Sequence, residues 1–220
     1  MTPLTEALVL GQLCLLVVVV AAAWRRRFPA AFLAYLLFQA GYLGLIFAAE
    51  HLITWNAWLL KEAAQAGIKL WLLAALGRDV LGGYPRAHAR FRWRAGVILV
   101  VMAGLAIGTA AFFPDRRLIA VVAPMFVWIM YGTTAAFGLL LASCLWHLIP
   151  IEPLRKAILL GLSAYLLVYC FTTYVITQAW YASDAAGYVH NAVYLMMLVY
   201  WAFAAWDRER HHALLTPSIT

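Results

Sequence analysis

The segment WLLKEAAQAGIKLWLL, residues 58–73, decides how this chain is organised. It is apolar at both ends, yet Lys61, Glu62, Gln65 and Lys69 all fall within nine residues of one another. Spacings of three and four residues place such side chains on one face of a helix. The segment therefore predicts an apolar helix with a single polar face.

The composition of the whole chain is that of a membrane protein. Of its 220 residues, 66% are hydrophobic and 11% are charged, and the mean hydropathy is +0.87. Apolar runs of about 20 residues, the length that a helix needs to cross a bilayer, recur along the sequence. These runs must be helical, because backbone polar groups in lipid have to bond internally. We predict an all-α, polytopic membrane protein with one domain, residues 1–220.

Seven spans are expected, and the connections between them are short. The first span is expected to be retained, because Arg25–Arg27 follow it, whereas the basic residues of a cleaved signal peptide precede its apolar run. The longest connection expected is Gly77–Arg94. The predicted spans are about residues 5–24, 29–53, 57–76, 96–113, 118–148, 154–180 and 187–206.

Lysine and arginine predict the orientation of the bundle. Twelve of the sixteen Lys and Arg residues fall on the side that holds the C-terminus, and only Arg116 and Arg117 fall on the other side. Cytoplasmic loops carry such an excess of positive charge. We therefore predict a seven-helix bundle in the bacterial cytoplasmic membrane, with the N-terminus outside and the C-terminus inside.

The polar face of the third span is the first candidate site. At 1.5 Å per residue, Lys69 lies about 18 Å below Ala57, past the middle of a core of about 30 Å. A charge at that depth costs at least about 2.5–3.5 kcal/mol unless it is paired or hydrated, so Lys69 should face the bundle. Lys61 is about one turn deep and is able to reach the outer headgroups. Gln65 belongs to the same polar face, and the candidate partners of Lys69 are polar side chains of the first three spans: Gln12, Gln39, Glu50 and Glu62.

Two interpretations of this face stay open. One is a polar pocket that binds a ligand or moves a proton, and the other is a structural network that ties the first three spans together. Aromatic and threonine side chains crowd the last two spans, among them Tyr165, Tyr169 and Tyr194. They pack in the core by default, and the alternative is the lining of a site for an apolar or amphipathic ligand.

Arginines and histidines suggest further contacts. Arg86, Arg90, Arg92 and Arg94 lie in the connection after the third span, where contact with anionic lipid is expected and docking of a cytoplasmic partner is the alternative.

No cofactor is predicted; His51 and His190, both near outer span ends, form the pair considered for a b-type haem. No metal, nucleotide or hydrolase motif is found, so we predict neither enzyme activity nor nucleic-acid binding.

The run AAWRRRFPAAFLAYLLFQAGYLGLIFAAEHL, residues 22–52, followed by WLLKEAAQAGIKLWLL, resembles the N-terminal seven-helix sensor region of bacterial membrane histidine kinases and related signalling proteins. The shared pattern is a first span closed by arginines, a second with small and aromatic residues, and a third with a lysine. The resemblance implies ligand binding within the bundle and output through the C-terminus. Those sensors continue into an output domain, whereas this sequence stops at DRERHHALLTPSIT, so a separate partner protein is expected.

Three functions follow as hypotheses. The first is a small seven-helix sensor or ligand-binding module that acts through a partner. The second is a structural or accessory subunit of a larger membrane complex. The third is a small transporter or a haem-binding electron carrier.

Overall fold

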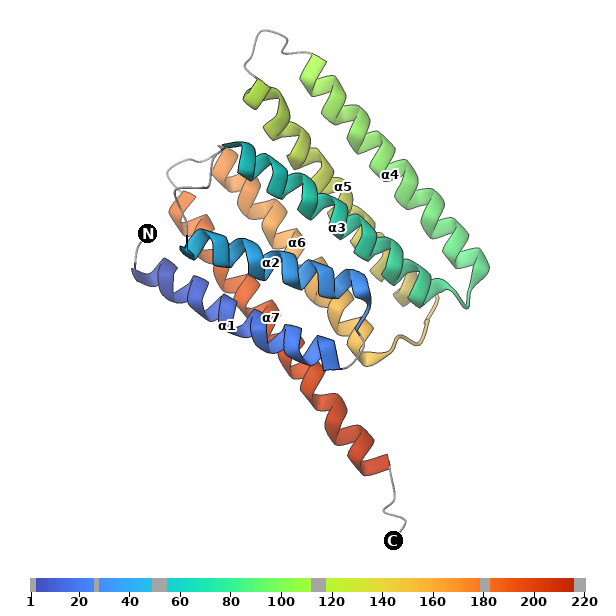
Figure 1. The fold of residues 1–220 in the computed structure, drawn as a ribbon. Coiled ribbons are helices and arrows are strands. Elements are labelled where there is room, and N and C mark those ends of the chain that lie inside the picture. Colours follow the sequence, from blue (N-terminus) through green and yellow to red (C-terminus); the bar gives the residue numbers. More distant parts are fainter. Residues whose placement is uncertain (1–2, 26–27, 49–54, 112–117, 179–182, 216–220) are drawn as a thin grey trace.

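The computed structural model describes residues 3–25, 28–48, 55–111, 118–178 and 183–215. Within these ranges the chain is all-α, with seven helices that follow one another along the sequence (Figure 1). They are α1 (Pro3–Arg25), α2 (Ala30–Ala48), α3 (Trp55–Leu81), α4 (Pro85–Ala111), α5 (Leu118–Trp146), α6 (Pro153–Gln178) and α7 (Ser183–Leu215). The all-α class and the seven consecutive helices that the sequence predicted are thus confirmed.

Four helices are long and apolar enough to cross a membrane, which indicates a membrane protein. The four segments are Glu6–Trp24 of α1, Met125–Trp146 of α5, Pro153–Val175 of α6 and Ala185–Ala205 of α7. In α2 the apolar stretch is shorter, Ala30–Leu45. α3 and α4 carry charged side chains in their apolar sequence or at its start. Passage of α2, α3 and α4 through a membrane therefore stays a prediction.

The connection between α3 and α4 differs from the expected one. A long loop over Gly77–Arg94 was the prediction, but α3 continues to Leu81 and α4 already begins at Pro85. Arginine is a good helix former, so the arginine-rich stretch extends α4, and proline suits the first position of a helix. Gly77 lets the two helices approach closely, because a Cβ there would lie 2.7 Å from the Phe91 ring.

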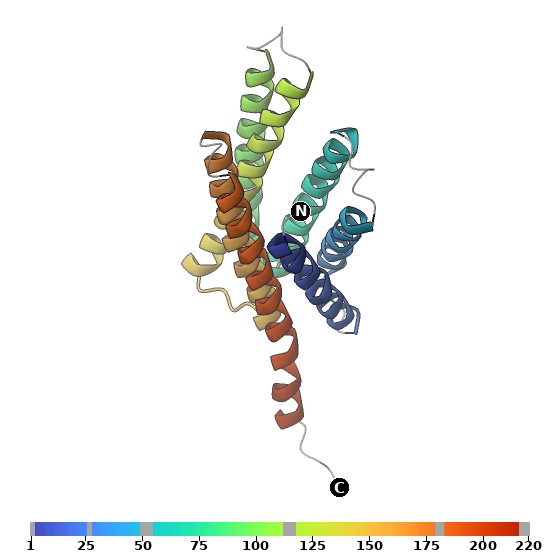
Figure 2. The ribbon, with the colours of Figure 1, turned by 90° about the vertical axis from the view of Figure 1, so that its left-hand side faces the viewer.

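The helices form a splayed bundle. α4 packs along α5, α6 along α7, and α1 against both α7 and α2, while α3 packs against α2 and α5. Figure 2 shows that α3 diverges from α5 toward the N-terminal end of α3. α7 runs well beyond the other helices at its C-terminal end (Figure 1). The bundle is therefore tight in one half and more open in the other.

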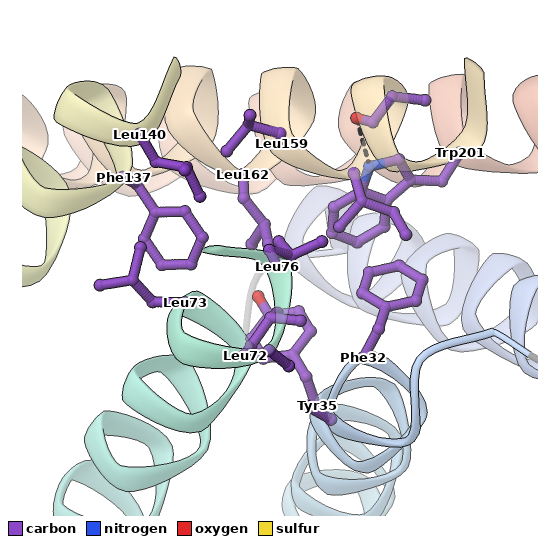
Figure 3. Close-up of a cluster of buried hydrophobic side chains, with 14 of the residues drawn as sticks. Phe32, Tyr35, Leu72, Leu73, Leu76, Phe137, Leu140, Leu159, Leu162 and Trp201 are labelled. Atoms are coloured by element: carbon purple, nitrogen blue, oxygen red, sulfur yellow. Dashed lines mark hydrogen bonds between the residues drawn. The ribbon is translucent and has the colours of Figure 1, made fainter. Parts of the chain in front are cut away.

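The tight half is centred on Trp201 of α7, which is 1% exposed. Its indole packs edge-on against Phe32 of α2, with ring centroids 4.8 Å apart, and its Nε1–H donates to the carbonyl of Ala157 at 3.0 Å (Figure 3). Gly161 lies beneath the indole, where a Cβ would be 2.6 Å from Nε1. We call this cluster the Trp201 core; its buried members include Phe32, Tyr35, Leu72, Leu76, Phe137, Leu140, Leu159, Leu162 and Trp201.

Candidate functional site

The polar face of α3 points into the bundle, as its spacing predicted. Gln65 is 4% exposed and Lys69 is 5% exposed, although both lie on a helix whose other faces are largely apolar. Buried side chains of this kind are almost always paired or hydrogen-bonded in folded proteins. The Oε1 atom of Gln65, however, has no hydrogen-bond partner among the described residues.

Lys61 belongs to the same polar face and makes a local pair. Its side chain is 16% exposed, and its Nζ lies 2.5 Å from Oε1 of Glu62. The ammonium also lies 4.9 Å from the centroid of the Tyr42 ring of α2. A neighbouring carboxylate and an aromatic face both stabilise a cation, so the Lys61 charge is compensated within the bundle. Glu62 is consequently the partner of Lys61 rather than of Lys69.

Lys69 is left without a counter-ion in the described part of the chain. No carboxylate of these residues lies within salt-bridge distance of its Nζ. The ammonium makes a cation–π contact with the ring of Tyr169 on α6, whose centroid is 5.4 Å from Nζ. A cation–π contact contributes about 0.5–2 kcal/mol, less than the cost of burying an ammonium. The charge is therefore only partly compensated.

A cavity of about 90 Å³ opens beside Lys69, and we call it the Lys69 cavity. That volume holds several water molecules, since one water needs roughly 10–15 Å³ measured in this way. Three helices supply the walls: α3 gives Glu62, Ala66 and Lys69, α5 gives Phe126, Val127, Ile129, Met130 and Thr133, and α6 gives Tyr169 and Thr173. The walls are mostly apolar, and their polar groups are the Lys69 ammonium, the Glu62 carboxylate and a few hydroxyl groups. An apolar lining with a few polar groups is typical of small-molecule sites.

Aromatic side chains connect the cavity to α7. The Tyr169 ring stacks on Tyr165, with centroids 6.0 Å apart, and lies 4.9 Å from the ring of His190. Tyr165 and His190 share a hydrogen bond of 3.3 Å between the hydroxyl and Nε2, and Tyr194 packs 5.1 Å from Tyr165. The other His190 nitrogen, Nδ1, is buried and has no partner among the described residues. A movement of Tyr169 would therefore displace His190, which belongs to α7.

This aromatic group was only partly anticipated. The sequence suggested core packing or a ligand lining for the tyrosines, and treated His190 as an interfacial residue or a haem ligand. The spacing of four residues, Tyr165 to Tyr169 and His190 to Tyr194, was the available signal, because it places each pair on one helix face. The sequence alone did not indicate that the two faces meet.

Several predicted residues lie elsewhere. The amide of Gln12 donates to the backbone carbonyl of Asn191 at 3.0 Å and to its side-chain oxygen at 3.1 Å, so it joins α1 to α7 rather than to α3. Gln39 is buried on α2 and does not line the Lys69 cavity. Glu50 and His51 lie outside the described residues, so neither the Glu50 contact nor the haem pair can be placed.

The four predicted arginines lie along the first turns of α4. Arg86, Arg90 and Arg94 recur every four residues and share one face, and Arg92 is also exposed. Trp93 is exposed between them, a residue type that suits a membrane interface. This charged surface lies at the opposite end of α3 from the Lys61–Glu62 pair, and it is separate from the Lys69 cavity.

Within the described ranges, no group of three His, Cys, Asp or Glu side chains lies close enough together to hold a metal ion. The site is therefore characterised by its own geometry: a buried ammonium beside a small cavity at the junction of α3, α5 and α6. No family model, curated protein or solved structure matches the chain.

Proposed function

We propose that the protein is a small seven-helix sensor of the bacterial cytoplasmic membrane, which binds a ligand in the Lys69 cavity and acts through a separate partner protein. The observation that carries this proposal is the burial of Lys69 beside a cavity without a counter-ion among the described residues. A lysine so placed destabilises the empty protein, and ionisable groups inside membrane segments commonly mark functional sites.

The lengths of the remaining helices support seven spans. α3 and α4 each have 27 residues and α2 has 19. At 1.5 Å per residue, these lengths correspond to about 40 Å and about 28 Å, against a hydrocarbon core of about 30 Å. Lys61, Glu62 and Lys69 of α3 are directed into the bundle, whereas the other charges lie at helix ends: Arg78 and Asp79 at the end of α3, and Arg86, Arg90 and Arg94 at the start of α4. All three helices can therefore lie in lipid.

The aromatic contacts supply a route for the signal. A ligand at Lys69 would touch Tyr169, which contacts His190 of α7. α7 continues without interruption to Leu215, well past the end of the bundle (Figure 1). A displacement of His190 would therefore be carried along a rigid element to the cytoplasmic side, where Arg208 and Arg210 are expected to meet an acidic partner surface or anionic lipid.

Native mass spectrometry of the full chain, released from mild detergent, tests the proposal. We expect wild type to retain a bound small molecule and Lys69→Leu to lose it. Lys156→Leu is the matched control, because Lys156 is exposed at the start of α6 and lies outside the cavity. If wild type and Lys69→Leu carry the same bound masses, the ligand-binding function is wrong.

Hydrogen exchange tests the sensor part separately. The same two proteins should differ in the exchange rates of backbone amides of α7 around His190, because loss of the ligand loosens the Tyr169–His190 contact. Equal exchange in α7, in variants that differ in bound ligand, would leave a binding protein without the proposed output.

A further inference from the structure

No carboxylate of the described residues lies within salt-bridge distance of the Lys69 ammonium, although the Glu62 carboxylate lines the same cavity. Glu62 pairs with Lys61 at 2.5 Å, and the Lys69 ammonium lies over the Tyr169 ring, 5.4 Å from its centroid. We infer that the cavity binds the carboxylate of a singly charged amphiphile, of the class of long-chain fatty acids, with the carboxylate on Lys69. This inference rests on the ligand-binding function proposed above, and it names the class of ligand.

The walls limit the ligand to one negative charge. Glu62 lines the same cavity as Lys69, so a second negative charge, as on a phosphate monoester, would meet a carboxylate of like sign. Thr133 already donates its hydroxyl hydrogen to the carbonyl of Ile129 at 2.8 Å, which leaves its oxygen as an acceptor only. The remaining cavity donors are the Lys69 ammonium and the hydroxyl groups of Tyr169 and Thr173, a set that suits one carboxylate.

The size of the cavity requires that most of the ligand lies outside it. Pockets that enclose drug-sized ligands measure roughly 300–1,000 Å³, whereas this one measures about 90 Å³. It therefore accommodates a head group and the first few carbon atoms. The α5 wall, with Phe126, Val127 and Met130, is apolar and partly exposed. An acyl chain can therefore leave the cavity along this wall into lipid.

Equilibrium binding of radiolabelled oleate to the full chain, in nanodiscs of phosphatidylcholine, tests the inference. We expect saturable binding by wild type and roughly ten- to hundredfold weaker binding by Lys69→Leu, the effect of losing a hydrogen bond to a charged group. Lys156→Leu should bind like wild type, because the mutation removes the same charge at an exposed site. Equal oleate affinities of wild type and Lys69→Leu would overturn the inference.

Competition separates the roles of charge and chain. Unlabelled oleate should displace the label, while butyrate, which lacks the chain, and oleyl alcohol, which lacks the charge, should be at least tenfold weaker. Displacement by oleyl alcohol as strong as that by oleate would overturn the carboxylate assignment. Strong displacement by phosphatidylglycerol would likewise overturn it and point to a phosphodiester headgroup.

A second variant keeps the test decisive if Lys69→Leu fails to fold. Met130→Trp adds bulk to the α5 wall and leaves Lys69 in place, and it should also abolish saturable oleate binding. The two proposals fail in different ways. If oleate does not bind but native mass spectrometry still shows a Lys69-dependent ligand, only the carboxylate class is wrong; if neither is found, the proposed function is wrong as well.

Discussion

The Trp201 core and the Lys69 cavity share helices α3, α5 and α6, but they are built in opposite ways. Around Trp201, large apolar side chains exclude water, and the buried indole N–H finds an acceptor in the carbonyl of Ala157. Around Lys69, a buried ammonium faces a cavity, and the nearby Gln65 and His190 each have a polar atom that meets no partner in the part of the chain that the structure describes. Close packing holds a bundle together, whereas unsatisfied buried polar groups oppose its folding.

The contrast runs through one helix, which contributes both to the packed core and to the proposed ligand site. α3 contributes Leu72 and Leu76 to the Trp201 core and, one to two turns earlier, Lys69 and Gln65 to the polar region. The packed half fixes where α3 lies, and the open half can then tolerate groups that weaken the fold. A ligand that pairs with Lys69 would stabilise the bundle by binding the folded state.

The largest effect is expected at Trp201. Trp201→Ala removes the indole from a fully packed site and should lower the free energy of unfolding by about 3–5 kcal/mol. Thermal or denaturant unfolding in a mild detergent measures the change. The matched control is Trp146→Ala, because Trp146 is 85% exposed at the end of α5 and should have little effect. Similar losses for both variants would show that the Trp201 core does not dominate stability.

The second effect has the opposite sign. Lys69→Leu, without added ligand, should raise the free energy of unfolding by up to about 2.5–3.5 kcal/mol, because it removes a charge that is poorly compensated inside the bundle. The comparison is made on delipidated protein by the same unfolding assay. Lys156→Leu serves again as the control and should be nearly neutral. A destabilised Lys69→Leu variant would show that Lys69 is a structural link rather than a ligand-binding residue.

The sequence predicted the fold well where periodicity and apolar length decide the outcome. Seven helices, and the burial of Gln65 and Lys69, follow from apolar runs and from spacings of three and four. The prediction of a long loop between α3 and α4 was wrong. The arginine-rich stretch was interpreted as a loop, although arginine favours helix.

The candidate site was predicted less completely, because periodicity identifies a face but not the helix it meets. The spacing indicated that Lys69 points inward, yet it could not identify Tyr169 as its neighbour or a cavity wall on α5. Gln12 is similar: its burial was expected, but its bond to Asn191 depends on α1 lying beside α7. Such pairings are set by tertiary packing, which a single sequence does not reveal.

The smallest effect tests how closely the Trp201 core is packed. Gly161→Ala would place a Cβ 2.6 Å from Nε1 of Trp201, so the indole or α6 must shift, at a cost of about 1–3 kcal/mol. Gly138 on α5 is the matched control, because a Cβ there meets nothing within 4 Å. Gly138→Ala should be neutral or stabilise by up to about 1 kcal/mol, since alanine favours helix over glycine. Equal free energies of unfolding for the two alanine variants would show that the Trp201 core is loosely packed. The packing of this core could then not be what offsets the cost of burying Lys69 on α3.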